Sequence, residues 1–320
     1  MSEHIPGDQG VPEKREDAAM SGRIGFIGVG HMGQPMARNL LKSGFELRVY
    51  DIHPDQAAPL VAHGAHQAFR LSDVAKSGGI VITMVPDDQV LEEVVLSEGG
   101  ILEQLGANGI HLSMSTVSPQ SAERFAALYA EQGSYYLAAT VLGRPDVAAA
   151  ARLSIFLAGP RVAKERVLPL LQVLGKDIYD VGEGVVAANV VKIAANFLIV
   201  SAIEAMGEAA ALVEGYGLNR AQFLYMMVAS PLFGGAVYEG YGRMIGENHY
   251  EQALFPVPLG LKDVDLVLST AAAMRVPVPL ASIARGHLMR AIAEGWAAQD
   301  WSVLARVIAT EARLPSETHA

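Results

Sequence analysis

Three glycines near the start of the chain have the spacing of a phosphate-binding loop. Gly28, Gly30 and Gly33 form the pattern G-x-G-x-x-G directly after an apolar segment, 24–27, that is typical of a strand. In such a loop the first glycine permits a tight turn, the second lets the backbone approach a pyrophosphate, and the third lets a helix pack closely against the strand. The sequence therefore predicts a dinucleotide-binding loop, whose expected contacts include two further loop residues, His31 and Met32.

An acidic residue follows this loop at the distance expected of a ribose ligand. Asp51 ends the next predicted strand, eighteen residues after Gly33. A carboxylate there accepts hydrogen bonds from the adenosine 2′-hydroxyl and repels a 2′-phosphate. Residues 52–54 contain no arginine that would bind such a phosphate. This pattern favours NAD over NADP as the cofactor, although an Asp that merely ends an exposed strand would look the same.

A lysine and an asparagine lie one helical turn apart in a long apolar segment. Lys192 and Asn196 have the i, i+4 spacing that places two side chains on one helix face. An apolar environment disfavours the charged form of a lysine, which lets its amine donate or accept a proton near neutral pH. Asn196 could then hold a substrate hydroxyl or the amine itself. The alternative is a lysine whose aliphatic stem covers the core while its amine reaches water, and the spacing alone does not decide.

The elements that must position these residues differ between the two halves of the chain. Short apolar runs alternate with helical segments in the first half; the expected strands are 24–27, 47–50, 80–84, 110–112, 135–137, 153–157 and 177–179. This alternation indicates βαβ units. The predicted fold class is therefore α/β, with a Rossmann-type doubly wound parallel sheet followed by an all-α C-terminal domain.

The second half of the chain is helical by its sequence pattern. Residues 185–214 contain no proline and almost no turn residue, which predicts one helix far longer than the average of about 11–12 residues. Further helices are expected at 220–229, 261–274, 280–294 and 301–311. The predicted organisation is a disordered extension over 1–22, a dinucleotide-binding domain over 23–183, and an all-α substrate and dimerisation domain over 184–320.

The composition excludes several classes of protein. The chain has 320 residues, of which 51% are hydrophobic, and a formal net charge of −10 without any Lys/Arg cluster, which does not suit a nucleic-acid surface. The lack of cysteine excludes disulfides and thiolate nucleophiles. No uninterrupted apolar run reaches the roughly 18 residues of a membrane helix, and the polar N-terminus lacks a signal peptide's apolar core. We expect a cytoplasmic protein with no membrane partner and no metal site.

Four motifs in order resemble the β-hydroxyacid dehydrogenase family, which includes 3-hydroxyisobutyrate dehydrogenase. They are 25–37 (GFIGVGHMGQPMA), 115–119 (STVSP), 182–184 followed by Lys192 and Asn196, and 261–263 (LKD). The resemblance runs from about residue 23 to about residue 311. It implies that Lys192 is the general acid/base and that Asn196 orients the substrate. It also implies contacts with the nicotinamide end of the cofactor by Thr116 and Lys262, and with its middle by Val85 and Pro86; we count Ser115 among the substrate-binding residues.

The chain departs from the family in one motif. Members that act on small carboxylates usually carry Asp-Ala-Pro-Val-Ser-Gly-Gly after the sixth strand, whereas residues 138–144 read AATVLGR. Leu142 and Arg144 therefore replace a serine and a glycine on either side of Gly143, and all three are candidate substrate-binding residues. Arg144 could hold a carboxylate through a bidentate pair, or Leu142 could mark a site for a bulkier, less polar substrate.

The hypothesis that these features favour is an NAD-dependent oxidoreductase. It would interconvert a β-hydroxyacid-like alcohol, as a small-molecule substrate, and its aldehyde or ketone. Imine reduction on the same scaffold is the alternative within enzymes, although those relatives commonly lack the lysine. A non-catalytic NAD-binding protein is a further alternative.

The long helix also predicts self-association. It is apolar around much of its circumference, so it must be covered on several sides, and the expected helices after it are few and short. We expect a homodimer or homotetramer, as the family resemblance also implies.

Overall fold

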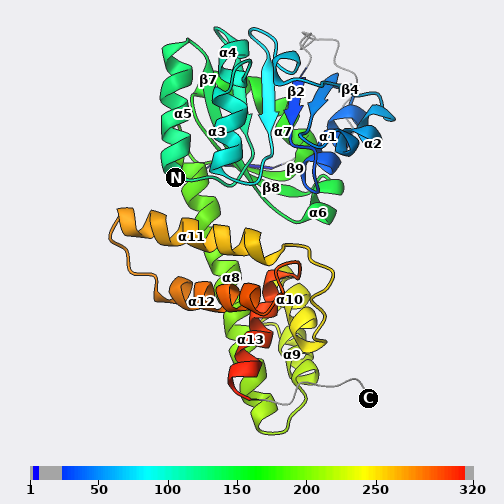
Figure 1. Ribbon diagram of the computed structural model, residues 1–320, viewed down its shortest axis with the longest axis vertical. Coiled ribbons are helices and arrows are strands. Elements are labelled where there is room, and N and C mark those ends of the chain that lie inside the picture. Colours follow the sequence, from blue (N-terminus) through cyan, green and yellow to red (C-terminus); the bar gives the residue numbers. More distant parts are fainter. Residues whose placement is uncertain (1–2, 7–23, 314–320) are drawn as a thin grey trace. The chain divides into compact units, whose positions relative to one another are not determined.

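The computed structural model describes residues 3–6 and 24–313 (Figure 1). The chain divides into two compact units, residues 1–192 and residues 193–320, which we call the first and second unit. Helix α8 (Val186–Gly215) begins in the first unit and continues into the second. The boundary expected from the sequence lies at residues 183 and 184, just before this helix, whereas the units divide within it.

Six strands of the first unit form a parallel sheet in the order β4-β3-β2-β5-β6-β7. From β2 the chain continues outward to β3 and β4, and it then crosses back to β5 on the other side of β2, so the strand order reverses between β2 and β5. Ligands of open α/β sheets bind at such a reversal, outside the carboxyl ends of the strands. The bounds are β2 (Ile24–Ile27), β3 (Leu47–Tyr50), β4 (His66–Gln67), β5 (Ile80–Thr83), β6 (Ile110–Ser113) and β7 (Tyr135–Leu142).

Helices cover both faces of this sheet, and alternate residues of each strand point to opposite faces. Phe26 and Ile82 belong to one hydrophobic core, and their neighbours Ile27 and Val81 belong to the other. The helices that contribute residues to the first core are α1 (Gly33–Lys42), α2 (Ala58–Val61), α6 (Pro145–Ala149) and α7 (Arg161–Leu174). Those that contribute to the second core are α3 (Asp88–Leu96), α4 (Ile101–Leu105), α5 (Pro119–Glu131) and the start of α8. Two short 3₁₀ helices, η1 (Pro54–Ala57) and η2 (Leu71–Asp73), lie in the connections. The predicted α/β class is confirmed.

The sheet is not wholly parallel, which corrects the prediction. β8 (Leu153–Ala158) pairs antiparallel with β7, and β9 (Gly175–Asp180) is parallel to β8. The connection from β7 to β8 spans only residues 143–152. A parallel crossover needs a dozen or more residues, so this short connection returns the chain in the opposite direction.

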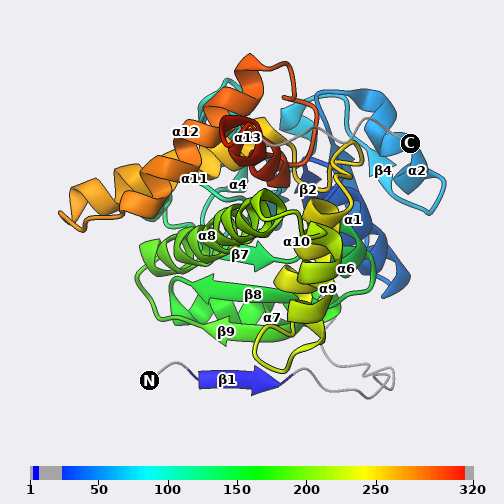
Figure 2. The same cartoon turned by 90° about the horizontal axis from the view of Figure 1, so that it is seen from below.

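The prediction of a disordered extension over residues 1–22 is wrong for four residues. Glu3–Pro6 form β1, which pairs antiparallel with β9 and lies beside it at the edge of the sheet (Figure 2). The pairing uses backbone groups that a sheet edge would otherwise leave unpaired, so its side-chain pattern gives little signal. The other residues of that segment lie outside the described part of the chain.

The second unit is built from helices, as predicted. After α8 come α9 (Arg220–Ala229), α10 (Ala236–Gly246), α11 (Val257–Ala273), α12 (Pro279–Ala293), the 3₁₀ helix η3 (Trp301–Val303) and α13 (Leu304–Glu311). The sequence pattern did not predict α10, because glycine disfavours helix interiors. The structure explains Gly246, since a Cβ at this position would lie 2.9 Å from the Cα of Ala221 on α9. The glycine thus allows α9 and α10 to approach closely.

A buried aspartate fixes the segment that enters α11. The carboxylate of Asp300 accepts hydrogen bonds from the backbone N–H groups of Leu254 and Phe255, at 3.1 and 3.0 Å, and from that of Ser302 at 3.0 Å. Asp300 itself is fully buried. One side chain therefore holds together two stretches of backbone that are far apart in sequence and sets where α11 begins.

Helix α8 is long and apolar, with a mean hydropathy of 1.9 over its most apolar window. By length and composition alone it would suit a membrane span, and the core helix of a soluble protein passes the same test. In the second unit its residues Ile193, Val200 and Ile203 belong to the hydrophobic core. The prediction of no membrane partner therefore remains a prediction, and part of α8 packs in the core of the second unit.

A buried histidine lies on β6, between β5 and β7. The Nε2 atom of His111 on β6 is 2.9 Å from the hydroxyl of Thr83 on β5, and the rings of Tyr129 and Tyr136 lie 5.3 and 5.1 Å from the imidazole. Complete burial lowers the pKa of His111 to about 3, because the charged ring would lose its hydration.

Acid should therefore destabilise the protein through His111. An unfolded chain takes up a proton on this residue near its ordinary pKa of 6.5, whereas the folded protein keeps the ring neutral until its pKa of about 3. The neutral His111 makes its full contribution to the free energy of unfolding above pH 6.5. This contribution is lost as the pH falls from 6.5 towards about 3, at up to about 1.4 kcal/mol per pH unit. Urea unfolding across this range should show a weaker pH dependence for His111→Gln than for the wild type. The same slope in both proteins would contradict the assignment.

Candidate functional site

The glycine loop joins β2 to α1 at the point where the strand order reverses. The backbone of Gly28 has φ +86° and its N–H donates to the carbonyl of Tyr50 at 3.0 Å. A Cβ on Gly28 would collide with the carbonyl of Met84, and one on Gly33 would collide with the carbonyl of Gly28. The fold therefore requires both glycines.

Gly30 is different from the two glycines beside it. A Cβ built on Gly30 meets no heavy atom of the described residues within 4 Å. The loop is therefore open at this position, as expected where a pyrophosphate approaches the backbone. His31 is exposed, while Met32 packs partly against the first core. These residues fit the phosphates of a dinucleotide.

Asp51 is attached to the glycine loop. Its Oδ2 accepts a hydrogen bond from the N–H of Val29 at 2.9 Å, and its Oδ1 accepts one from the N–H of His53 at 3.0 Å. The carboxylate therefore lies at the end of β3, directly beside the loop. This is the position that a ribose ligand needs.

The loops after β5 and β6 are tied together by side chains. The hydroxyl of Ser115 accepts the N–H of Val85 at 2.8 Å, and the carboxylate of Asp88 accepts the N–H of Ser118 at 3.0 Å. Ser115 is fully buried, which favours a role in holding the loop over direct contact with a substrate. Val85 is buried, Pro86 is exposed and Thr116 is partly buried.

The start of α8 is bonded to this same region. Asn189 donates from Nδ2 to the carbonyl of Val117 at 3.0 Å, and Thr140 of β7 donates to the carbonyl of Ala188 at 2.9 Å. Lys192 lies one turn further along α8 and is buried. The sequence does not single out Thr140, because a lone threonine inside a strand gives no signal.

In the second unit, Asp263 links two of the predicted site residues. One carboxylate oxygen lies 2.7 Å from the Nζ of Lys262, and the other accepts a hydrogen bond from the amide of Asn196. Asp263 is almost fully buried, and so is Asn196. The Leu-Lys-Asp motif predicted a role for Lys262 but none for Asp263, the acid beside it, which contacts both partners.

The three candidate substrate residues after β7 form the turn into α6. Gly143 has φ +151°, and a Cβ there would lie 2.7 Å from Leu153. Arg144 follows as the N-cap residue of α6, with its Nε 3.6 Å from Asp146 Oδ1. Its side chain is 36% exposed, so solvent reaches this guanidinium.

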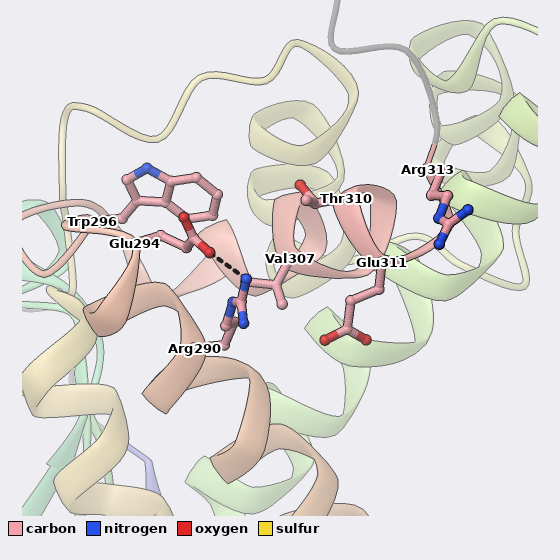
Figure 3. Close-up of a pocket in the computed structure, with 7 residues that line it drawn as sticks. All are labelled: Arg290, Glu294, Trp296, Val307, Thr310, Glu311 and Arg313. Carbon is pink, nitrogen blue, oxygen red and sulfur yellow. Dashed lines mark ion pairs between the residues drawn. The ribbon is translucent and has the colours of Figure 1, made fainter.

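A cavity in the second unit contains none of the predicted site residues (Figure 3). It has a volume of about 250 Å³ and includes an ion pair in which Arg290 lies 2.6 Å from Glu294. Its lining is completed by Trp296, Val307, Thr310, Glu311 and Arg313. Across the described residues no group of three His, Asp or Glu side chains could hold a metal ion.

Known families match both halves of the chain. The NAD-binding domain of 6-phosphogluconate dehydrogenase matches residues 23–182, and the NAD-binding region of NADP-dependent 3-hydroxyisobutyrate dehydrogenase matches residues 186–308. The uncharacterized oxidoreductase YfjR of Bacillus subtilis is 46% identical over 286 residues, which cover 89% of this chain and 99% of that protein. The NAD-dependent L-serine dehydrogenase of Pseudomonas aeruginosa is 32% identical over 292 residues, with coverage of 89% and 97%.

Solved structures share the same architecture. The crystal structure of 3-hydroxyisobutyrate dehydrogenase (ygbJ) from Salmonella typhimurium has a TM-score of 0.80 at 25% identity and covers 89% of this chain and 99% of that one. Psf3 in complex with NADP⁺ and a reductive aminase from Aspergillus terreus in complex with NADPH are both 23% identical, with TM-scores of 0.76 and 0.58. These last two likenesses show the fold alone.

Gly30→Ala and Gly33→Ala should separate cofactor binding from folding. Gly30→Ala should keep the wild-type melting temperature but weaken NADH binding at least tenfold, or about 1.4 kcal/mol, because the new methyl occupies the open face of the loop. Gly33→Ala should lower the melting temperature as well, because its Cβ collides with the Gly28 carbonyl. Thermal unfolding and NADH fluorescence titration measure the two effects. Wild-type NADH affinity in Gly30→Ala would show that no phosphate group occupies this face.

Proposed function

The chain belongs to the β-hydroxyacid dehydrogenase family and is an oxidoreductase, and we propose that it interconverts a β-hydroxyacid-like alcohol and its aldehyde or ketone with NAD. The observation that carries the proposal is the placement of Lys192. It is a buried lysine on a helix whose preceding turn is hydrogen-bonded to β7 and to the loop after β6. A reaction of this type needs a group that moves a proton beside the reacting carbon.

Each proposed residue has a distinct task in this reaction. When bound, the nicotinamide supplies or accepts the hydride. Lys192 takes the proton of the substrate hydroxyl during oxidation and returns it during reduction. Asn196, whose amide is held by Asp263, orients the substrate. Lys262 and Thr116 are proposed to contact the nicotinamide end of the cofactor, and Val85 and Pro86 its middle.

The substrate is proposed to be a small molecule with an acidic group. Relatives are named for 2-(hydroxymethyl)glutarate, L-serine and 3-hydroxyisobutyrate, at 32% identity in each case. In this chain the acidic group would pair with Arg144, whose guanidinium is partly exposed and lies 3.6 Å from Asp146. Leu142 would add apolar contact and admit a bulkier side chain.

Imine reduction is the second candidate, because reductive aminases and imine reductases share the fold. The replacement of a serine by Leu142 is the feature that favours it. The buried Lys192 favours the hydroxyacid reaction instead, since it offers the proton transfer that alcohol oxidation requires. Comparing hydroxy acids with amines in an NADH absorbance assay distinguishes the two activities.

We also propose that the enzyme works in the cytoplasm.

Removing the lysine amine should abolish most of the turnover while leaving cofactor binding intact. Lys192→Ala should reduce kcat by roughly two to four orders of magnitude, the usual contribution of general acid–base catalysis. Lys176→Ala is the matched control, because Lys176 is an exposed lysine on β9 of the same unit, and it should behave as the wild type. Full turnover in Lys192→Ala would overturn the proposed mechanism.

The cofactor preference should follow the charge of Asp51. NADH should bind more tightly than NADPH, because the carboxylate at the end of β3 would face the 2′-phosphate. Asp51→Asn should narrow the difference, whereas Asp55→Asn, at an exposed neighbouring acid, should not change it. Isothermal titration with both dinucleotides measures this preference. Tighter binding of NADPH to the wild type would contradict the assignment.

We also propose that a second copy of the chain covers α8. Large apolar side chains remain exposed on the second unit, among them Leu198 at 70%, Leu212 at 65% and Tyr225 at 75%. A contiguous exposed apolar surface marks an interaction site, and a two-fold dimer is the commonest arrangement. A homotetramer built from such dimers would cover still more of it.

The molecular mass measured in solution by light scattering should be at least twice the 33.9 kDa of one chain. Leu198→Glu combined with Leu212→Glu should shift the protein towards the monomer, because each substitution places a charge in the proposed interface. Val162→Glu, at an apolar residue that is 60% exposed on α7 of the first unit, should leave the mass unchanged. A wild-type mass of one chain would disprove self-association.

A further inference from the structure

Two buried side chains hold the turn of α8 that precedes Lys192. The hydroxyl of Thr140 donates to the carbonyl of Ala188 at 2.9 Å, and the amide of Asn189 donates to the carbonyl of Val117 at 3.0 Å. Thr140 is 0% exposed and Asn189 1%. We propose that Thr140 and Asn189 are positioning residues, which fix the height and rotation of α8 so that the Lys192 amine meets the substrate. The proposal rests on the proposed function of Lys192.

The surface under this turn would not fix the helix without these bonds. Val185 and Ala188 pack in the second core of the first unit, which also contains Ala138 and Ala158 of the sheet. Apolar contacts between small side chains are not directional, so such a helix can rotate or slide with little change in buried area. A hydrogen bond, by contrast, is directional and weakens steeply when its angle becomes poor. Two such bonds, one from β7 and one to the loop after β6, therefore define one position.

The bond from Thr140 reaches the backbone of Lys192 through one shared atom. In an α-helix the carbonyl of residue 188 accepts the N–H of residue 192. The oxygen that receives the Thr140 hydroxyl is therefore the same one that fixes the amide of Lys192. A shift of β7 against α8 is passed directly to the catalytic lysine.

The bond from Asn189 connects this turn with the loops that are proposed to hold the cofactor. Val117 follows Thr116, which we assign to the nicotinamide end. The same loop is bonded to the loop after β5, where the Ser115 hydroxyl accepts the N–H of Val85. The turn of α8 before Lys192 and the loops after β5 and β6 are thus held in one hydrogen-bonded array within the first unit. A misplacement of about 1 Å in such an array can cost about 100-fold in rate.

Thr140→Val tests the hydroxyl with almost no change in shape. It should lower kcat by about 10- to 100-fold and shift the limb of the pH–kcat profile that belongs to Lys192, with KM and NADH affinity unchanged. Thr140→Ser, which keeps the hydroxyl, should restore both the rate and the profile. Thr83→Val is the matched control: it removes another fully buried threonine hydroxyl from the same sheet, one that pairs with His111.

Asn189→Leu tests the second bond in the same way. Asn39→Leu is its control, because Asn39 on α1 also donates its buried amide to a backbone carbonyl, that of Ala148 at 2.8 Å. Asn189→Leu should lower kcat and Asn39→Leu should not. Wild-type kcat and pH profiles in both Thr140→Val and Asn189→Leu would overturn the proposal, and so would an equal loss of rate in Thr140→Ser and Thr140→Val.

Hydrogen–deuterium exchange separates this proposal from the proposed function. Backbone amides of residues 188–192 should exchange faster in Thr140→Val than in the wild type or in Thr83→Val, whatever the substrate is. If Lys192→Ala retains full turnover, the proposed function fails, and the role of Thr140 in catalysis fails with it. If Lys192→Ala is inactive while exchange and kcat in Thr140→Val match the wild type, only the positioning role is wrong.

Discussion

The parallel pairing of β2 with β5, and of β5 with β6, is the constraint on which the proposed site depends. Parallel strands end at the same edge of a sheet, so the loops that follow these three strands must lie side by side. The strand pairing alone therefore brings three loops together at one edge of the sheet. They are the glycine loop, the segment with Val85 and the segment with Thr116. The close approach of β2 to α1 is possible because Gly33 lacks a side chain.

Several aspartates join parts of the chain that are far apart in sequence. Asp51, Asp88 and Asp300 each accept hydrogen bonds from backbone N–H groups of a segment distant in sequence. Asp263 instead joins two side chains, those of Lys262 and Asn196. A carboxylate has two oxygens and only accepts hydrogen bonds, so it suits backbone N–H groups that a loop leaves without partners. Part of the acidic excess of the chain therefore lies within the fold and carries a structural role.

The sequence predicted the elements whose signal is local. The glycine loop, Asp51 and the long helix follow from spacing and apolar pattern, and the structure has each of them where the pattern indicates. It could not predict interactions set by tertiary contact: the antiparallel return of β8, the glycine-rich α10 against α9, or the hydrogen bond of Thr140 to Ala188. A threonine inside a strand has the same local pattern whether its hydroxyl is bonded to a helix or not.

The pairing of β1 with β9 constrains the amino-acid sequence of β1 only weakly. Residues Glu3–Pro6 join the sheet through backbone groups, and almost any residue that can adopt an extended conformation supports such a pairing. Selection can therefore change the side chains of β1 freely while it preserves the strand. Two relatives could therefore share this edge strand and yet show no similarity in the four residues that form it.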